Sequence, residues 1–317
     1  MKFDLEYRCE SRDGEVVTWD DTVAKIEINF DCPEFSKARL ISEIDDFLLI
    51  ESLAEGQRCA CLEIVWDSGD EITYEYRMNR AAPVKGSNSQ RDFLISGAEV
   101  EVFSSLAYNN LKVHSQYGLV KSALQAMTLF EDETIGVKFM RLFSAFEGLV
   151  LAFRRIENLE FSIPKFDDRQ AIERAVSATL KSHELLKGEP KLRALLYENI
   201  SGLFRISLRQ AATEFFTKNN IVLTDTWAMF DTSGGISLLQ IRNRIAHGEN
   251  FNKEEWWDII EALKSLNTIL DRCILSMLGW DYQKSKSHLR HELDPKLESA
   301  RRALSQAIAP VGSGPAK

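Results

Sequence analysis

The chain has 317 residues, of which 44% are hydrophobic and 10% aromatic, and its formal net charge is −9 at pH 7. These values are typical of a globular protein, and the length suffices for about two domains. The sequence has no apolar run of about eighteen residues and no apolar segment at its N-terminus, so we expect a cytoplasmic protein without a membrane span.

The charge is divided unevenly along the chain. Residues 1–110 hold 11 basic and 23 acidic residues, a net −12, whereas residues 111–317 hold 28 basic and 25 acidic residues, a net +3. This split indicates two modules with different partners. The acidic module is unsuited to RNA, so we expect it to bind a protein partner or trigger, or to mask a basic active site. It could also be a soluble acidic domain with neither role.

Residues 1–96 are predicted to form an acidic, β-rich N-terminal domain. Alternation of apolar and polar residues predicts strands, and helical spacing predicts one helix between them. Residues 67–71, between the last two strands, have the composition of a hairpin loop. The strands are expected at 23–30, 60–66 and 72–78, and the helix at 40–53.

Residues 97–283 are predicted to form an all-helical domain, which makes the fold class α+β. The remaining residues, 284–317, are expected to form a charged helix over 293–308 and a disordered tail. The domain's helices are expected at 117–130, 134–157, 168–187, 190–218, 235–247 and 253–279.

One of these helices ends in a dense polar motif, Arg242-Asn-Arg-Ile-Ala-His247, followed by Gly248. Asn243 and His247 are four residues apart and therefore share a helix face. Gly248 suits the position just beyond a helix end, which places His247 in the last turn. There the helix dipole favours a protonated imidazole, by roughly 0.3–1 kcal/mol at exposed sites.

This combination of residues suits a site that holds and cleaves a phosphodiester. An imidazole at a helix end can act as general acid or base near neutral pH. A guanidinium can pair with phosphate oxygens and stabilise the charge of the transition state. Arginine and histidine are also ordinary capping residues near a helix end, so the motif alone leaves both interpretations open.

An upstream helix adds a carboxylate. Residues 139–153 are mostly apolar, with Glu147 in the middle. A lone buried glutamate is unfavourable unless a cation pairs with it, and Arg242 is the candidate.

Together these residues resemble the HEPN superfamily, in particular the HEPN domain of the ApeA-like anti-phage proteins. In that family a helix with an aromatic residue four positions before a glutamate precedes a helix that carries Arg-Asn-x-x-x-His. Phe143, Glu147, Arg242, Asn243 and His247 match this pattern. The resemblance covers about residues 115–280, and residues 1–96 resemble more faintly the N-terminal domain of the same proteins, which implies a sensor or regulatory role.

The resemblance implies an endoribonuclease that needs no metal or other cofactor and acts in anti-phage defence or as a toxin. The 2′-hydroxyl of RNA, with tRNA as a candidate substrate, would attack the adjacent phosphorus and leave a 2′,3′-cyclic phosphate and a 5′-hydroxyl. His247 would transfer protons, Arg242 would hold the phosphate, Asn243 would orient the phosphate or the imidazole, and Glu147 would fix Arg242. The family usually dimerises with two motifs facing each other, so one motif per chain implies a homodimer.

The sequence leaves two other functions open. Some HEPN-like bundles only assemble with partners, and Glu147 and Arg242 would then be a structural pair. The chain could also be a toxin that a partner protein masks.

Three further arginines are weak candidates for RNA contacts, with solvated helix surface as the alternative for each: Arg244, Arg154 and Arg155. The five cysteines have irregular spacing, so we expect reduced thiols and no metal site.

Overall fold

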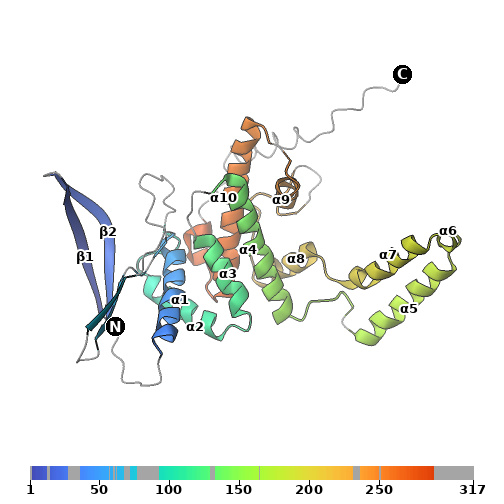
Figure 1. Cartoon of the computed structure of the whole chain (residues 1–317), viewed down its shortest axis with the longest axis horizontal. Helices are drawn as coiled ribbons and strands as arrows, with labels where there is room; N and C mark the ends of the chain where they lie inside the picture. Colours follow the sequence, from blue (N-terminus) through green and yellow to red (C-terminus); the bar gives the residue numbers. More distant parts are fainter. Residues whose placement is uncertain are drawn as a thin grey trace. The chain divides into compact units, whose positions relative to one another are not determined.

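A computed structural model gives the fold of the chain (Figure 1). It describes residues 2–12, 15–27, 36–56, 58–59, 61, 63–67, 72–76, 93–128, 133–163, 165–230, 236–249 and 251–288. Packing of the backbone divides the chain into two units, Met1–Ile44 and Asp45–Lys317. The described part is mostly helical with antiparallel strands, as expected for the α+β class.

The first unit contains a long antiparallel hairpin. Strand β1 (Lys2–Arg12) pairs with β2 (Glu15–Glu27), with Lys2 opposite Glu27 and a shift of register between Tyr7 and Cys9. The sequence predicted a strand in part of β2 but none at β1. Helix α1 (Lys37–Glu55) follows and continues across the division between the units, slightly longer than the predicted 40–53.

The second unit begins with the end of α1 and a short hairpin of β3 (Glu63–Asp67) and β4 (Ile72–Tyr76). This hairpin was predicted, with small differences at its ends. Leu94 and Ile95 are buried in the same core as the helices, and the backbone N–H of each donates to the carbonyl of Ala54 at the end of α1. Residues 45–56 and 93–96 therefore pack with the helices of the second unit.

The core of this unit lies between α2 (Val100–Val113), α3 (Tyr117–Thr128), α4 (Ile135–Ile156) and α10 (Lys253–Met277). Helices α3, α4 and α10 lie side by side in Figure 1, and α4 contacts both of the others. Each helix buries one apolar stripe, as its helical periodicity requires. Fully buried members include Phe103, Leu124, Phe139, Phe143, Leu266 and Ile274. Helix α2 was not among the predicted helices.

The predicted helix over 190–218 is broken in the structure. Helix α7 (Pro190–Ile200) continues into a 3₁₀ turn, Ser201–Phe204, and α8 (Leu208–Lys218) starts anew. The residues between α7 and α8 make backbone hydrogen bonds with the segment after α4. The N–H of Ser162 donates to Phe204 O, and the N–H of Ile206 donates to Glu160 O. Ser207 then caps α8.

The predicted helix over 168–187 is also interrupted. Helix α5 (Phe166–Ser182) ends at His183, whose extended backbone separates it from the short α6 (Glu184–Lys187). Helix α5 then packs against α7 (Figure 1). No helix in the described part of the chain is long and apolar enough to cross a bilayer.

Candidate functional site

The polar motif lies on α9 (Leu238–Ala246), a helix with a well-defined start. Ser237 is its N-cap, and its hydroxyl accepts from the N–H of Gln240 at 3.2 Å, while the Gln240 amide oxygen accepts from the N–H of Ser237 at 2.9 Å. This reciprocal capping satisfies N–H groups that have no partner within the helix. Leu238 and Ile241 are buried, so the motif's polar residues lie on the other faces of α9.

A loop ahead of α9 fixes where the helix begins. The Trp227 indole N–H donates to Ile236 O at 2.7 Å, and the N–H groups of Leu238 and Leu239 donate to the carbonyls of Ala228 and Met229. Trp227 is fully buried, which anchors this loop in the core. The start of the motif helix is therefore tied to residues ten positions earlier in the chain.

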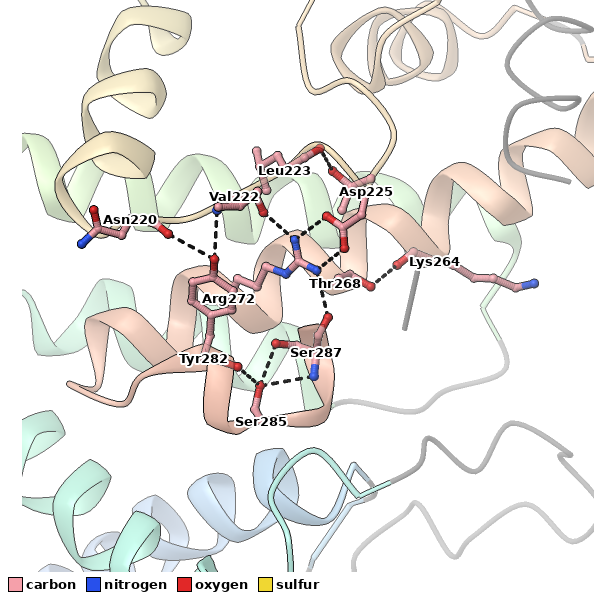
Figure 2. Close-up of polar contacts among 11 residues, drawn as sticks. Asn220, Val222, Leu223, Asp225, Lys264, Thr268, Arg272, Tyr282, Ser285 and Ser287 are labelled. Atoms are coloured by element: carbon pink, nitrogen blue, oxygen red, sulfur yellow. Dashed lines mark hydrogen bonds and ion pairs between the residues drawn. The ribbon is translucent and has the colours of Figure 1, made fainter. Parts of the chain in front are cut away.

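The same loop is held by a buried arginine of α10 (Figure 2). Arg272 is 2% exposed, and its guanidinium pairs with both carboxylate oxygens of Asp225, at 2.7 and 2.5 Å. It also donates to the carbonyls of Val222 and Ser287. A bidentate pair of this kind is geometrically specific, so Arg272 joins the loop before α9 to the segment after α10.

Glu147 of α4 and Arg242 of α9 meet, as the sequence predicted. The Arg242 Nη2 to Glu147 Oε1 distance is 3.7 Å, and the side chains are 31% and 35% exposed. The expectation of a buried glutamate was wrong, because Glu147 lies on the half-exposed side of α4. Arg242 Nη1 also donates to the amide oxygen of Asn243 at 3.2 Å. The structure thus brings Glu147, Arg242 and Asn243 together.

His247 lies at the C-cap of α9 and is exposed to solvent. Its backbone N–H donates to the carbonyl of Asn243 at 2.9 Å, which confirms the helical spacing that places both residues on one face. No side-chain hydrogen bond of His247 occurs within the described residues. Gly248 follows with φ of 70°, a left-handed conformation that glycine adopts without strain. The imidazole is thus accessible.

The three arginines considered as RNA contacts all have polar partners. Arg244 pairs with Glu249 at 2.7 Å. Arg154 donates to two carbonyls of the turn after α4, each at 3.4 Å. Arg155, which is exposed, donates to the side chain of Gln116 at 3.3 Å. Binding of RNA by these three arginines therefore stays a prediction. Arg155 is the most accessible of the three.

The cysteines and possible metal ligands form no obvious site in the described residues. No group of three or more His, Cys, Asp or Glu side chains is arranged to hold a metal ion there. Cys59 and Cys61 are half-buried and Cys273 is buried. Burial, with smaller contributions from Glu55 and Glu51, raises the pKa of Cys59 to about 11, so this thiol stays protonated near neutral pH. The side chains of Cys9 and Cys32 lie outside the described part.

Sequence reasoning missed the residues that hold the end of α9. Phe251, Glu249 and Glu255 all contact Arg244. The sequence predicted a helix that begins at residue 253, but no local pattern indicates that Glu255 in its first turn faces Arg244. Comparisons of the chain with protein-family models, with curated proteins and with solved structures found no match.

Proposed function

We propose that the chain is a metal-independent endoribonuclease of the HEPN type. The observation that carries the proposal is the Glu147–Arg242 contact, which joins the two separate sequence motifs in one place. Arg242 bonds to Asn243, and the helix that carries both ends at an exposed imidazole. A guanidinium, a carboxamide and an accessible histidine on one short helix can assist in-line attack on a phosphodiester by holding the phosphate, stabilising its charge and transferring protons.

The reaction would be an internal transfer at phosphorus. The 2′-oxygen of a ribose bonds to the adjacent phosphorus while the bond to the 5′-oxygen of the next nucleotide breaks. The 2′-hydroxyl loses its proton to a base, and the leaving 5′-oxygen gains one from an acid. His247 takes one of these roles, and Arg242 stabilises the negative charge on the non-bridging oxygens, with Glu147 holding the guanidinium in place. The products are a 2′,3′-cyclic phosphate and a 5′-hydroxyl.

A homodimer would supply the second imidazole. Helix α4 has a stripe of residues on its less buried side, and this stripe also carries Glu147. Val137 is 55% exposed, Ser144 is exposed, and Met140, Gly148 and Leu151 are half-buried. The spacing of three and four residues is that of a helix packing seam, and Ser144 and Gly148 allow close approach. Two α4 helices packed through this stripe would bring two Glu147–Arg242 pairs towards one cleft.

The exposure of the pair argues against a purely structural role. Loss of one partner destabilises a fold most when the remaining charge is buried, as the Arg272 guanidinium of the Arg272–Asp225 pair is. The Glu147–Arg242 pair is half-exposed and more widely spaced. A role in anti-phage defence or as a toxin rests on the family resemblance alone.

The proposal is tested by incubating the purified chain with total RNA and with tRNA in EDTA. We expect cleavage by the parent protein and its loss in the variants His247→Ala and Arg242→Ala, both with unchanged circular dichroism. If the folded parent protein cuts neither RNA under these conditions, the nuclease proposal fails.

A further inference from the structure

The turn that ends α9 has an unusual closing contact. The N–H of Gly248 donates to Ile245 O and the N–H of Glu249 donates to Arg244 O, each at 3.0 Å, which is the paired hydrogen-bond pattern of a Schellman turn. The first and last residues of such a turn usually make an apolar contact. Here these residues form an ion pair, since Arg244 Nε donates to Glu249 Oε2 at 2.7 Å. His247 lies inside this closed turn.

A second carboxylate holds the same guanidinium from α10. Glu255 Oε1 lies 3.4 Å from both Nη1 and Nη2 of Arg244, and Glu255 Oε2 accepts from the N–H of Asn252 at 2.8 Å. The side chains of Arg244 and Glu255 are only 17% and 9% exposed. Arg244 is therefore fixed between the turn that contains His247 and the first turn of α10.

Aromatic packing extends this arrangement to α4. The Arg244 guanidinium stacks over the Phe251 ring at 4.3 Å, and the Phe251 and Trp256 rings are 5.2 Å apart. The far end of the Trp256 ring lies against Gly136 in the first turn of α4, as does Ile245. The end of the motif helix is thus attached to the helix that carries Glu147.

We propose that Arg244 is a positioning residue that sets the location of the His247 imidazole relative to the Glu147–Arg242 pair. The inference rests on the proposed nuclease function and assigns Arg244 a role other than RNA contact. A guanidinium that already faces two carboxylates has little net positive charge to offer a phosphate. The contact of Arg244 with Glu249 closes the turn that contains His247, and its contact with Glu255 holds this turn against α10.

Kinetics of three variants test the proposal: Arg244→Ala, Arg244→Lys and the control Arg174→Ala, which removes an exposed arginine from α5. We expect Arg244→Ala to lower kcat by about 10- to 100-fold, because a small misplacement of a reacting group has effects of this size. KM should stay within about twofold of the parent value. Arg244→Lys should recover part of the rate, because an ammonium can keep one of the two carboxylate contacts. Arg174→Ala should behave like the parent.

Direct RNA contact gives a different pattern. If Arg244 bound a phosphate, Arg244→Ala would raise KM with kcat unchanged and would lower the slope of log affinity against log salt by about one. Either result overturns the proposal, as does an unchanged kcat.

A measurement without RNA separates this inference from the proposed function. The ring signals of His247, assigned in a nuclear magnetic resonance spectrum by comparison with His247→Ala, should be single and sharp in the parent. They should shift or multiply in Arg244→Ala but not in Arg174→Ala. If the parent does not cleave RNA, the nuclease proposal fails while this measurement still decides whether Arg244 fixes the imidazole. Unchanged His247 signals in Arg244→Ala refute the positioning role.

Discussion

Glu147, midway along α4, lies 3.7 Å from Arg242 of α9, although 94 residues of sequence separate the two positions. Both side chains remain about one third exposed, at 35% and 31%. Water therefore screens the pair, and its attraction contributes little to the stability of the fold. The contact matters because it fixes the position of the Arg242 guanidinium.

Removal of this pair should affect cleavage far more than folding. We expect Glu147→Gln and Arg242→Ala to change the free energy of unfolding by less than about 1 kcal/mol, the range of exposed ion pairs. Arg242→Ala should lower the RNA cleavage rate by roughly 10²-fold or more, as loss of a group that stabilises transition-state charge does. Urea unfolding and single-turnover cleavage measure the two effects. If the variants lost several kcal/mol of unfolding free energy while the folded Arg242→Ala protein cleaved RNA at the parent rate, the pair would be structural.

The ion pair between the buried Arg272 of α10 and Asp225 provides the contrasting case. Arg272 is 2% exposed and joined to Asp225 by two hydrogen bonds, so Asp225→Ala leaves a buried guanidinium without its counter-charge. We expect this change to lower the free energy of unfolding by about 3–5 kcal/mol. The measurement is urea unfolding beside Glu147→Gln. If Asp225→Ala and Glu147→Gln lowered the free energy of unfolding by equally small amounts, the two ion pairs would not differ as expected.

Sequence periodicity was sufficient for the long helices of the core. Helices α4 and α10 were predicted within two residues at each end, because each has a continuous apolar stripe and a recognisable start or stop. The break between α7 and α8 was not predicted. Its cause is long-range, since residues 204–206 pair with residues 160–162, and no local pattern reports a partner forty residues away.

Gly248 should be needed for its backbone conformation alone. A Cβ added there would meet no atom within 4 Å, but φ is 70°. We therefore expect Gly248→Ala to lower the free energy of unfolding by about 1–2 kcal/mol through strain in the left-handed region. Gly248→Asn should lower it less, because asparagine tolerates this region. Thermal unfolding of both variants tests this, and equal stability of Gly248→Ala and the parent would show that the turn differs in solution.

Stability at low pH should depend on Asp46, which α1 buries against α2 and α3. Burial alone would raise the pKa of Asp46, but hydrogen bonds from Lys112, Lys121 and Tyr117 outweigh it and hold that pKa below its usual value. A carboxyl with a lowered folded pKa stabilises the fold above its unfolded pKa of 3.8, and this contribution is lost as pH falls through the folded pKa. Asp46→Asn should therefore be less stable than the parent at pH 7, with the difference shrinking below pH 3.8.

Urea unfolding between pH 2 and pH 7 measures this difference, with the pH range set by the acid transition of carboxyl groups. A difference that stays constant, or grows as pH falls, would show that Asp46 does not carry the stabilising charge.

The proposed dimer seam on α4 gives a prediction about assembly. Val137 is 55% exposed, so Val137→Arg should leave the subunit folded while placing a charge in the seam. We expect a dimer for the parent and a monomer for this variant in sedimentation velocity. Val113→Arg on α2 is the control, because that valine is 82% exposed and lies outside the seam. A parent monomer, or a dimer that survives Val137→Arg, would exclude this seam.

The candidate site was predictable in part from residue types and spacing. The Arg242–Glu147 contact followed from the need of a carboxylate in an apolar helix for a cation, although Glu147 is more exposed than expected. The contacts of Arg244 were not predictable, because they depend on how the turn after α9 folds back towards α10. Short-range sequence patterns identify the candidate catalytic residues, whereas the packing between helices decides which other side chains hold those residues in place.

The chemistry of the RNA ends tests the central claim most directly. A labelled single-stranded RNA is incubated in EDTA with the parent and with His247→Ala, and both new ends are identified. We expect 2′,3′-cyclic phosphate and 5′-hydroxyl ends with the parent and intact RNA with His247→Ala. Cleavage by His247→Ala at the parent rate, or 3′-hydroxyl and 5′-phosphate ends from either protein, would contradict it.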